Sequence, residues 1–170
     1  TVEEYRLSFK INDPINLFSP RPDLDAYVNN VQFEDLNGNL LTVIPVYKPY
    51  QIRIGVKINC NVPSLILGVG FTTLDNIALR TIWSKPQMLT KGEYDFILKE
   101  EKIYYTGKYR LQIGISKANG KVNIQFINDA SIVEFENYID PKKAINTLSG
   151  LIINQENFHI ENKSKNDKYI

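Results

Sequence analysis

The sequence predicts an all-β protein, specifically an immunoglobulin-like antiparallel β-sandwich. Apolar and polar residues alternate through most of the chain, which is the pattern of strands that bury one face. The alternating segments are short, and words rich in turn-forming residues, such as KPQ, TKG and KANG, separate them. No segment between residues 26 and 136 has the period of a helix. Short strands at such regular spacing are typical of a sandwich.

Each strand is predicted from its own local pattern. Residues 26–35 alternate cleanly, and the word LNGN after them is a turn that contains glycine. Pro45 marks the next segment, residues 40–47, as an edge strand or a strand end, because proline has no N–H to donate. Further strands are expected at residues 49–60, 64–76, 76–84, 92–99, 107–116, 120–129, 130–136 and 151–161.

These strands are expected to form one domain. Residues 26–160 make the β-sandwich, and residues 1–25 make an N-terminal extension or linker that contains a further strand at residues 4–11. Residues 137–150 are expected to be a loop, and residues 161–170 a polar tail. Since the chain starts at Thr1 without an initiator Met, we expect it to be a domain of a longer protein.

Composition narrows the class of protein. Hydrophobic residues make up 43% of the chain, charged residues 23%, and the formal net charge is +1. This balance is ordinary for a globular protein and argues against nucleic acid or an anionic membrane surface as the main partner. No apolar run approaches the roughly 20 residues that span a bilayer, and from the given residues we expect no signal peptide. The single cysteine, Cys60, excludes an internal disulfide and favours a reducing, cytoplasmic compartment.

Two glycines on one face of a predicted strand point to a surface site. In residues 64–76 the apolar positions alternate with Gly68, Gly70 and Thr72. Glycine weakens a strand interior, so its use here needs a reason. If the strands at 49–60, 64–76 and 107–116 are neighbours, their polar faces join into a shallow trough. The candidate residues are Gln51, Arg53, Lys57, Gly68, Gly70, Thr72, Arg110, Gln112 and Ser116.

The trough has the chemistry of a sugar site. Amide and guanidinium groups hydrogen-bond hydroxyl groups, and a flat polar ligand can approach bare backbone. Alternatively, the glycines relieve crowding, mark bulges, or receive a residue from a second sheet or subunit. Trp83, the only tryptophan, is expected in the core because it shares parity with Ile77 and Leu79.

Motifs of catalysis and cofactor binding are absent from the sequence. It has no G-x-x-x-x-G-K-[ST] phosphate loop, no G-x-S-x-G elbow and no H-E-x-x-H. His159 is the only histidine, so it has no second histidine for a metal cluster. We therefore predict a protein that is not an enzyme and that holds neither a cofactor nor a metal.

The order of strands and turns resembles the C-terminal domain of the ATP-binding subunit of O-antigen polysaccharide ABC transporters, the Wzt family. The segments that carry the likeness are VNNVQFEDLNGN, VYKPYQIRIGVKI, LILGVGFTTLDNIALRTIWS, LTKGEYDFILKEEKIYYTGKYRLQIGIS and GLIINQENFHIE, within residues 26–160. The resemblance implies an immunoglobulin-like sandwich that recognises a lipid-linked O-polysaccharide without catalysis. It also implies a sugar site on a concave sheet face.

The resemblance further implies partners and a location. It implies a homodimer in which the last strand is exchanged, and a membrane transporter subunit reached through the parent protein. The location implied is the cytoplasmic, inner face of the bacterial inner membrane. Two other functions remain open at this point: a dimer-forming sandwich that docks another protein, and a small β-sandwich hydrolase with paired carboxylates.

Overall fold

A computed structural model describes residues 14–45, 48–100, 106–136 and 158–162 of the chain, and only the backbone of the last range. Within these residues the regular structure is entirely strand. The strands are β1 (Ile15–Leu17), β2 (Ala26–Glu34), β3 (Ile44–Pro45), β4 (Tyr50–Ile58), β5 (Val62–Thr73), β6 (Ala78–Trp83), β7 (Gln87–Leu89), β8 (Gly92–Glu100), β9 (Gly107–Lys117), β10 (Val122–Glu136) and β11 (Phe158–Asn162).

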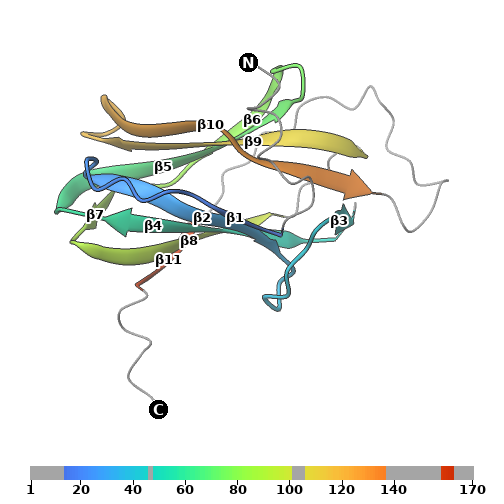
Figure 1. Ribbon diagram of the computed structural model, residues 1–170, viewed down its shortest axis with the longest axis horizontal. Coiled ribbons are helices and arrows are strands. Elements are labelled where there is room, and N and C mark those ends of the chain that lie inside the picture. The colour runs from blue at the N-terminus through green and yellow to red at the C-terminus, as the bar shows by residue number, and fades with distance from the viewer. Residues whose placement is uncertain (1–13, 46–47, 101–105, 137–157, 163–170) are drawn as a thin grey trace, which may run out of the picture.

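The strands form two sheets that pack face to face, as Figure 1 shows. The first sheet has the order β1-β2-β4-β8-β11, and the second has the order β3-β10-β9-β5-β6. The short strand β7 pairs with one end of β5. This arrangement confirms the predicted β-sandwich. The neighbours β10-β9-β5-β6 match the G-F-C-C′ sheet of immunoglobulin-like domains, and β2-β4-β8 match their A-B-E strands.

Alternation along the strands builds the core between the sheets. Ile52, Ile54 and Val56 of β4 are fully buried, and so are Leu67 and Val69 of β5. Their neighbours in sequence point to the outer faces. Since a strand turns every second side chain to the same side, the same sequence word supplies one core face and one surface face.

Pro45 occupies an edge strand, as its missing N–H predicts. β3 is two residues long and pairs in parallel with the end of β10, where Ile44 lies opposite Phe135. A short edge strand that contains proline offers little free backbone to another sheet edge. β3 thus covers the edge of the second sheet beside Phe135 and Glu136 of β10.

β10 corrects the prediction of two strands separated by a turn at residues 127–129. It is one strand of 15 residues, with a register shift between Ile127 and Ser131 against β9. The shift is a β-bulge, which inserts unpaired residues and bends the strand without ending it. The polar residues Asn128 and Asp129 were mistaken for turn residues because bulges and turns share these residue types.

Side-chain hydrogen bonds also join the sheets along one side of the sandwich. A second bulge interrupts the pairing of β2 with β4 between Val28 and Asn30. The backbone N–H of Val28 instead donates to Oε1 of Gln125, on β10 in the other sheet, at 2.8 Å. Asn16 of β1 similarly donates to Oγ of Ser131 at 3.0 Å. These contacts supply partners for polar groups near the seam between the sheets.

The described residues include only some of the elements expected near the two ends of the chain. The proline-rich segment before residue 26 contains β1, which pairs with β2. Of the predicted last strand, residues 158–161 belong to β11, which pairs with β8 of the same chain. The strand expected at residues 4–11, the loop at 137–150 and most of the polar tail lie outside the described residues. Among the described residues, no helix is long and apolar enough to cross a membrane.

Candidate functional site

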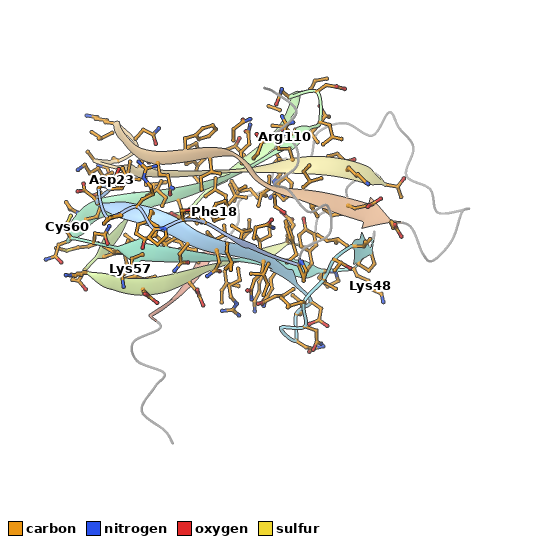
Figure 2. All side chains as sticks on the ribbon, viewed as in Figure 1. Phe18, Asp23, Lys48, Lys57, Cys60 and Arg110 are labelled. Carbon is orange, nitrogen blue, oxygen red and sulfur yellow. The ribbon has the colours of Figure 1, made fainter. Side chains whose placement is uncertain are left out.

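The residues predicted to form one polar trough lie on two different sheets. Gln51, Arg53 and Lys57 are on β4 in the first sheet, whereas the others are on β5 and β9 in the second. Figure 2 shows Lys57 and Arg110 on opposite layers of the sandwich. The trough required β4 to lie beside β5 and β9, and this condition is not met. Alternation identifies the outward face of a strand, but it does not say which sheet the strand joins.

The β4 residues take part in ion pairs on the outer face of the first sheet. Nε of Arg53 lies 2.9 Å from Oε1 of Glu34, and its Nη1 lies 3.3 Å from Oδ2 of Asp95. Gln51 donates to the other oxygen of Glu34 at 2.5 Å. Nζ of Lys57 lies 2.8 Å from Oε1 of Glu93. These cross-strand partners give the β4 side chains a structural role.

Glu34 is held in its charged form by this network. Burial raises the pKa of its carboxyl group, but hydrogen bonds from Arg53, Gln32 and Gln51 outweigh burial and leave the pKa below its ordinary value. Gly55, beside Arg53 on β4, admits the bulge of β2, because a Cβ there would collide with the side chains of Asn29 and Asn30.

On the second sheet, β5 and β9 are neighbours as predicted, and their glycines form part of a row across four strands. Gly68 of β5 pairs with Gly114 of β9 on one side and with Trp83 of β6 on the other. Gly114 pairs in turn with Phe126 of β10. The row therefore reads Phe126, Gly114, Gly68, Trp83 across the outer face of the sheet.

Aromatic rings occupy the space that the glycines leave. A Cβ at Gly68 would stand 2.6 Å from Cζ3 of Trp83, and one at Gly114 would stand 3.6 Å from Cδ2 of Phe126. Both aromatic side chains are 59% exposed to solvent. The glycines thus let two large rings lie close to the backbone while their remaining surface faces water. We call these four residues the aromatic platform.

The position of Trp83 corrects the expectation that it belongs to the core. In β6 the buried residues are Arg80 and Ile82, and Trp83 has the opposite parity. Ile77, in the turn before β6, is itself 62% exposed, so the parity that Trp83 shares with it marks the outer face and not the core.

Amide groups lie beside the platform in the next row. Gln112 of β9 pairs with Gly70 of β5, and Gly70 pairs with Thr81 of β6. A Cβ at Gly70 would stand 3.3 Å from Oε1 of Gln112, so that glycine gives room to the amide. Nε2 of Gln112 donates to Oδ1 of Asn128 at 2.6 Å. The bulge in β10 supplies Asn128. We call Gln112 and Asn128 the amide pair.

The other predicted residues of this face offer little to a ligand at the surface, because Arg110 is paired and the hydroxyl groups of Thr72 and Ser116 are buried without a hydrogen-bond partner among the described residues. Arg110 forms an ion pair with Asp129, with Nε 2.5 Å from Oδ1, and donates to Asn76 in the turn between β5 and β6. Thr72 and Ser116 are buried. Of the predicted set, Gly68 therefore belongs to the aromatic platform, and Gly70 and Gln112 lie in the row beside it.

Sequence reasoning missed Trp83, Phe126 and Asn128 as surface residues of one site. Hairpin register supplies only part of the signal. The N–H of Thr73 donates to O of Ile77 at 2.9 Å, and counting back from this turn would place Ile82 opposite Gly68. The register shift between Phe71 and Thr72 brings Trp83 there instead. A shift between Asn123 and Gln125 likewise brings Phe126, and not its neighbour, opposite Gly114.

The described residues contain no group of three or more side chains suited to a metal ion. Cys60 is exposed, and its Sγ lies 3.3 Å from Oδ1 of Asp25. The hydrogen bond to Asp25 raises the pKa of this thiol, and burial adds to the effect. A raised pKa leaves a smaller share of the thiol as the reactive thiolate at neutral pH. His159 lies in β11, opposite Ile97 of β8.

The fold and its outward-facing platform define a β-sandwich with a candidate binding surface on one sheet. Among solved structures, the chain is similar to the C-terminal domain of Wzt, with a TM-score of 0.65 and 15% sequence identity. The alignment covers 90% of this chain and 95% of that one. The chain therefore has the fold of the Wzt C-terminal domain, as the sequence resemblance predicted.

Other comparisons add little. The CARDB domain of a Pyrococcus furiosus protein aligns over 69% of this chain and 97% of its own, with 17% identity and a TM-score of 0.41. A TM-score this low supports no argument about function. No protein-family model matches the sequence, and no curated protein matches it.

Proposed function

We propose that this chain is a non-catalytic glycan-binding module and that the aromatic platform is its binding surface. The observation that carries the proposal is the pair of exposed rings, Trp83 and Phe126, beside the paired glycines Gly68 and Gly114. The faces of sugar rings that carry C–H groups pack well against aromatic rings, which offer a large apolar area with a negative face. An exposed aromatic pair on a polar sheet matches that requirement.

The amide pair complements the rings. A sugar that rests on Trp83 or Phe126 directs hydroxyl groups to its sides, where Gln112 and Asn128 lie in the adjoining row. Each amide offers both donors and acceptors, so the pair can meet a hydroxyl in either role. Both rings are well exposed on a sheet face, which favours a stretch of polysaccharide over a small enclosed ligand.

We further propose the biological setting. The Wzt-like fold and the sequence resemblance support recognition of a lipid-linked O-polysaccharide on behalf of an ABC transporter, at the cytoplasmic face of the bacterial inner membrane. They also support a homodimer that exchanges its last strand. β11 pairs with β8 at the edge of the first sheet, and exchange of such an edge strand between identical copies is a known route to a dimer.

The experiment is an NMR titration of the labelled 170-residue chain with the O-polysaccharide of its source strain. We expect saturable shifts at Trp83, Gly68, Gly114 and Gln112. Removing one aromatic ring, by Trp83→Ala or Phe126→Ala, should weaken binding about threefold to tenfold. The matched control is Tyr27→Ala, which removes a half-buried aromatic residue of the first sheet and should leave affinity unchanged.

Two outcomes would overturn the proposal in different ways. Shifts confined to the first sheet would keep glycan binding and remove the platform as its site. No response to glycan, together with a stable dimer in light scattering, would favour the protein-docking alternative, in which the exposed rings contact another polypeptide.

A further inference from the structure

We infer that the platform selects an uncharged stretch of glycan and disfavours acidic sugars. This inference rests on the proposed function and concerns the same surface. Its basis is the distribution of charge over the outer face of the second sheet. The platform row consists of aromatic residues and glycines, and the next row contains Gln112, Gly70, Thr81 and Asn128. Every member of these two rows is uncharged.

The cations that β9 directs to this face are already paired with carboxylates. Arg110 is paired with Asp129, and Lys108 lies 3.5 Å from Oε2 of Glu134 on β10. An anionic sugar would therefore have to displace an existing partner before it could use either cation. That exchange gains little, since one ion pair replaces another.

Within the Arg110–Asp129 ion pair, the acidic side chain is more exposed to solvent than the basic one. The side chain of Asp129 is 42% exposed, whereas that of Arg110 is 18% exposed. Asp129 follows Asn128 directly in the bulge, so its carboxylate lies at the border of the amide pair. A ligand that reaches the amide pair thus meets the negative partner first, and a carboxylate or phosphate on that ligand is repelled.

Matched oligosaccharides test this inference on the whole chain. The probes are hexasaccharides of glucose, galactose and mannose, each compared with its counterpart in which C6 is a carboxylate instead of a hydroxymethyl group. We expect the acidic member of a bound pair to bind about threefold to tenfold more weakly at low salt. Binding of the neutral member should change less than about twofold between low and high salt.

Variants separate the two charges. Asp129→Asn keeps the shape of the side chain but releases Arg110, so affinity for the acidic probe should rise while affinity for the neutral probe stays the same. Arg110→Gln combined with Asp129→Asn removes both charges and should bind the two probes equally. The matched control, Glu93→Gln, removes a carboxylate of the first sheet and should change neither affinity. Thermal unfolding of each variant verifies that it is folded.

The outcomes distinguish the inference from the proposed function. If an acidic probe binds as well as its neutral counterpart, or better, the inference is wrong and glycan binding stands. If no probe of either kind binds, and the strain's own polysaccharide does not bind either, both the function and the inference are overturned. Preference for the neutral probe that Asp129→Asn abolishes supports the inference.

Discussion

The indole of Trp83 fills the space above Gly68, its partner on the neighbouring strand. Three atoms of its six-membered ring lie within 3.1 Å of the position that a Cβ at residue 68 would take. The absence of a side chain at Gly68 is thus what allows the indole to rest against β5. A single methyl group at that position has a predictable effect on the ring.

Gly68→Ala should push the indole away from the sheet. Trp83 is exposed and can move, so we expect the protein to remain folded, with a loss of stability of about 1 kcal/mol or less. Trp83 fluorescence should shift to longer wavelength as the ring becomes more hydrated, because it is the only tryptophan in the chain. Gly114→Ala is the matched control, since its Cβ would stand at an ordinary 3.6 Å from Phe126. An unchanged emission spectrum in Gly68→Ala would contradict this contact.

Arg80 and Glu100 form a buried ion pair between the sheets, with side-chain exposures of 6% and 0%. Glu100→Gln should destabilise the protein by about 3–5 kcal/mol, because it removes one charge of a buried ion pair. Replacing both residues, by Arg80→Met and Glu100→Leu, should recover most of that loss. Urea unfolding measures both values. A cost below about 1 kcal/mol for the single variant would show that the pair is hydrated.

Because the pKa of Glu34 is lowered, the free energy of unfolding should depend on pH. A carboxyl group with a folded pKa below 4.5 stabilises the protein above that pH, and the contribution is lost as pH falls through the folded pKa. Glu34→Gln should therefore be less stable than the parent at pH 7, and the difference should narrow as the pH is lowered toward 3. Denaturant unfolding across this range is the measurement. Asp75→Asn, in the exposed β5–β6 turn, is the control and should follow the parent throughout.

The raised pKa of Cys60 predicts slow alkylation. Because the thiolate is the reactive form, iodoacetamide should modify the folded chain more slowly at pH 8 than the urea-unfolded chain. Asp25→Asn removes the carboxylate that accepts from the thiol, and it should speed the reaction and shift its pH midpoint downward. If folded and unfolded chains react at the same rate, Asp25 does not control this thiol.

From the sequence, the buried face of each strand could be predicted better than the strands that lie beside it. In β5, Leu67 and Phe71 are buried as expected, while Gly68 and Gly70 lie on the outer side. Period-two alternation carries this information within a single strand. β4 alternates in the same way, yet it joins the other sheet. Sheet membership depends on long-range pairing, which a local pattern does not contain.

The candidate site was predicted in part for the same reason. Glycines at 68 and 70 did mark an unusual surface, but the trough expected there is occupied by the side chains of Trp83 and Gln112. Those contacts depend on the register of two hairpins and on the bulge that ends at Ser131. Register shifts move side chains between faces, and their positions are not evident from residue types alone.

The outer position of Trp83 next to the buried Ile82 has a consequence for how this surface can evolve. Ile82 packs in the core, whereas Trp83 contacts a glycine and solvent. Phe126, Gln112 and Asn128 likewise lie outside the buried core cluster. Mutation can therefore exchange these residues one at a time and change the chemistry of this surface, while the core residues that stabilise the fold stay the same. Such a scaffold can vary one outer face at little cost to its folding free energy.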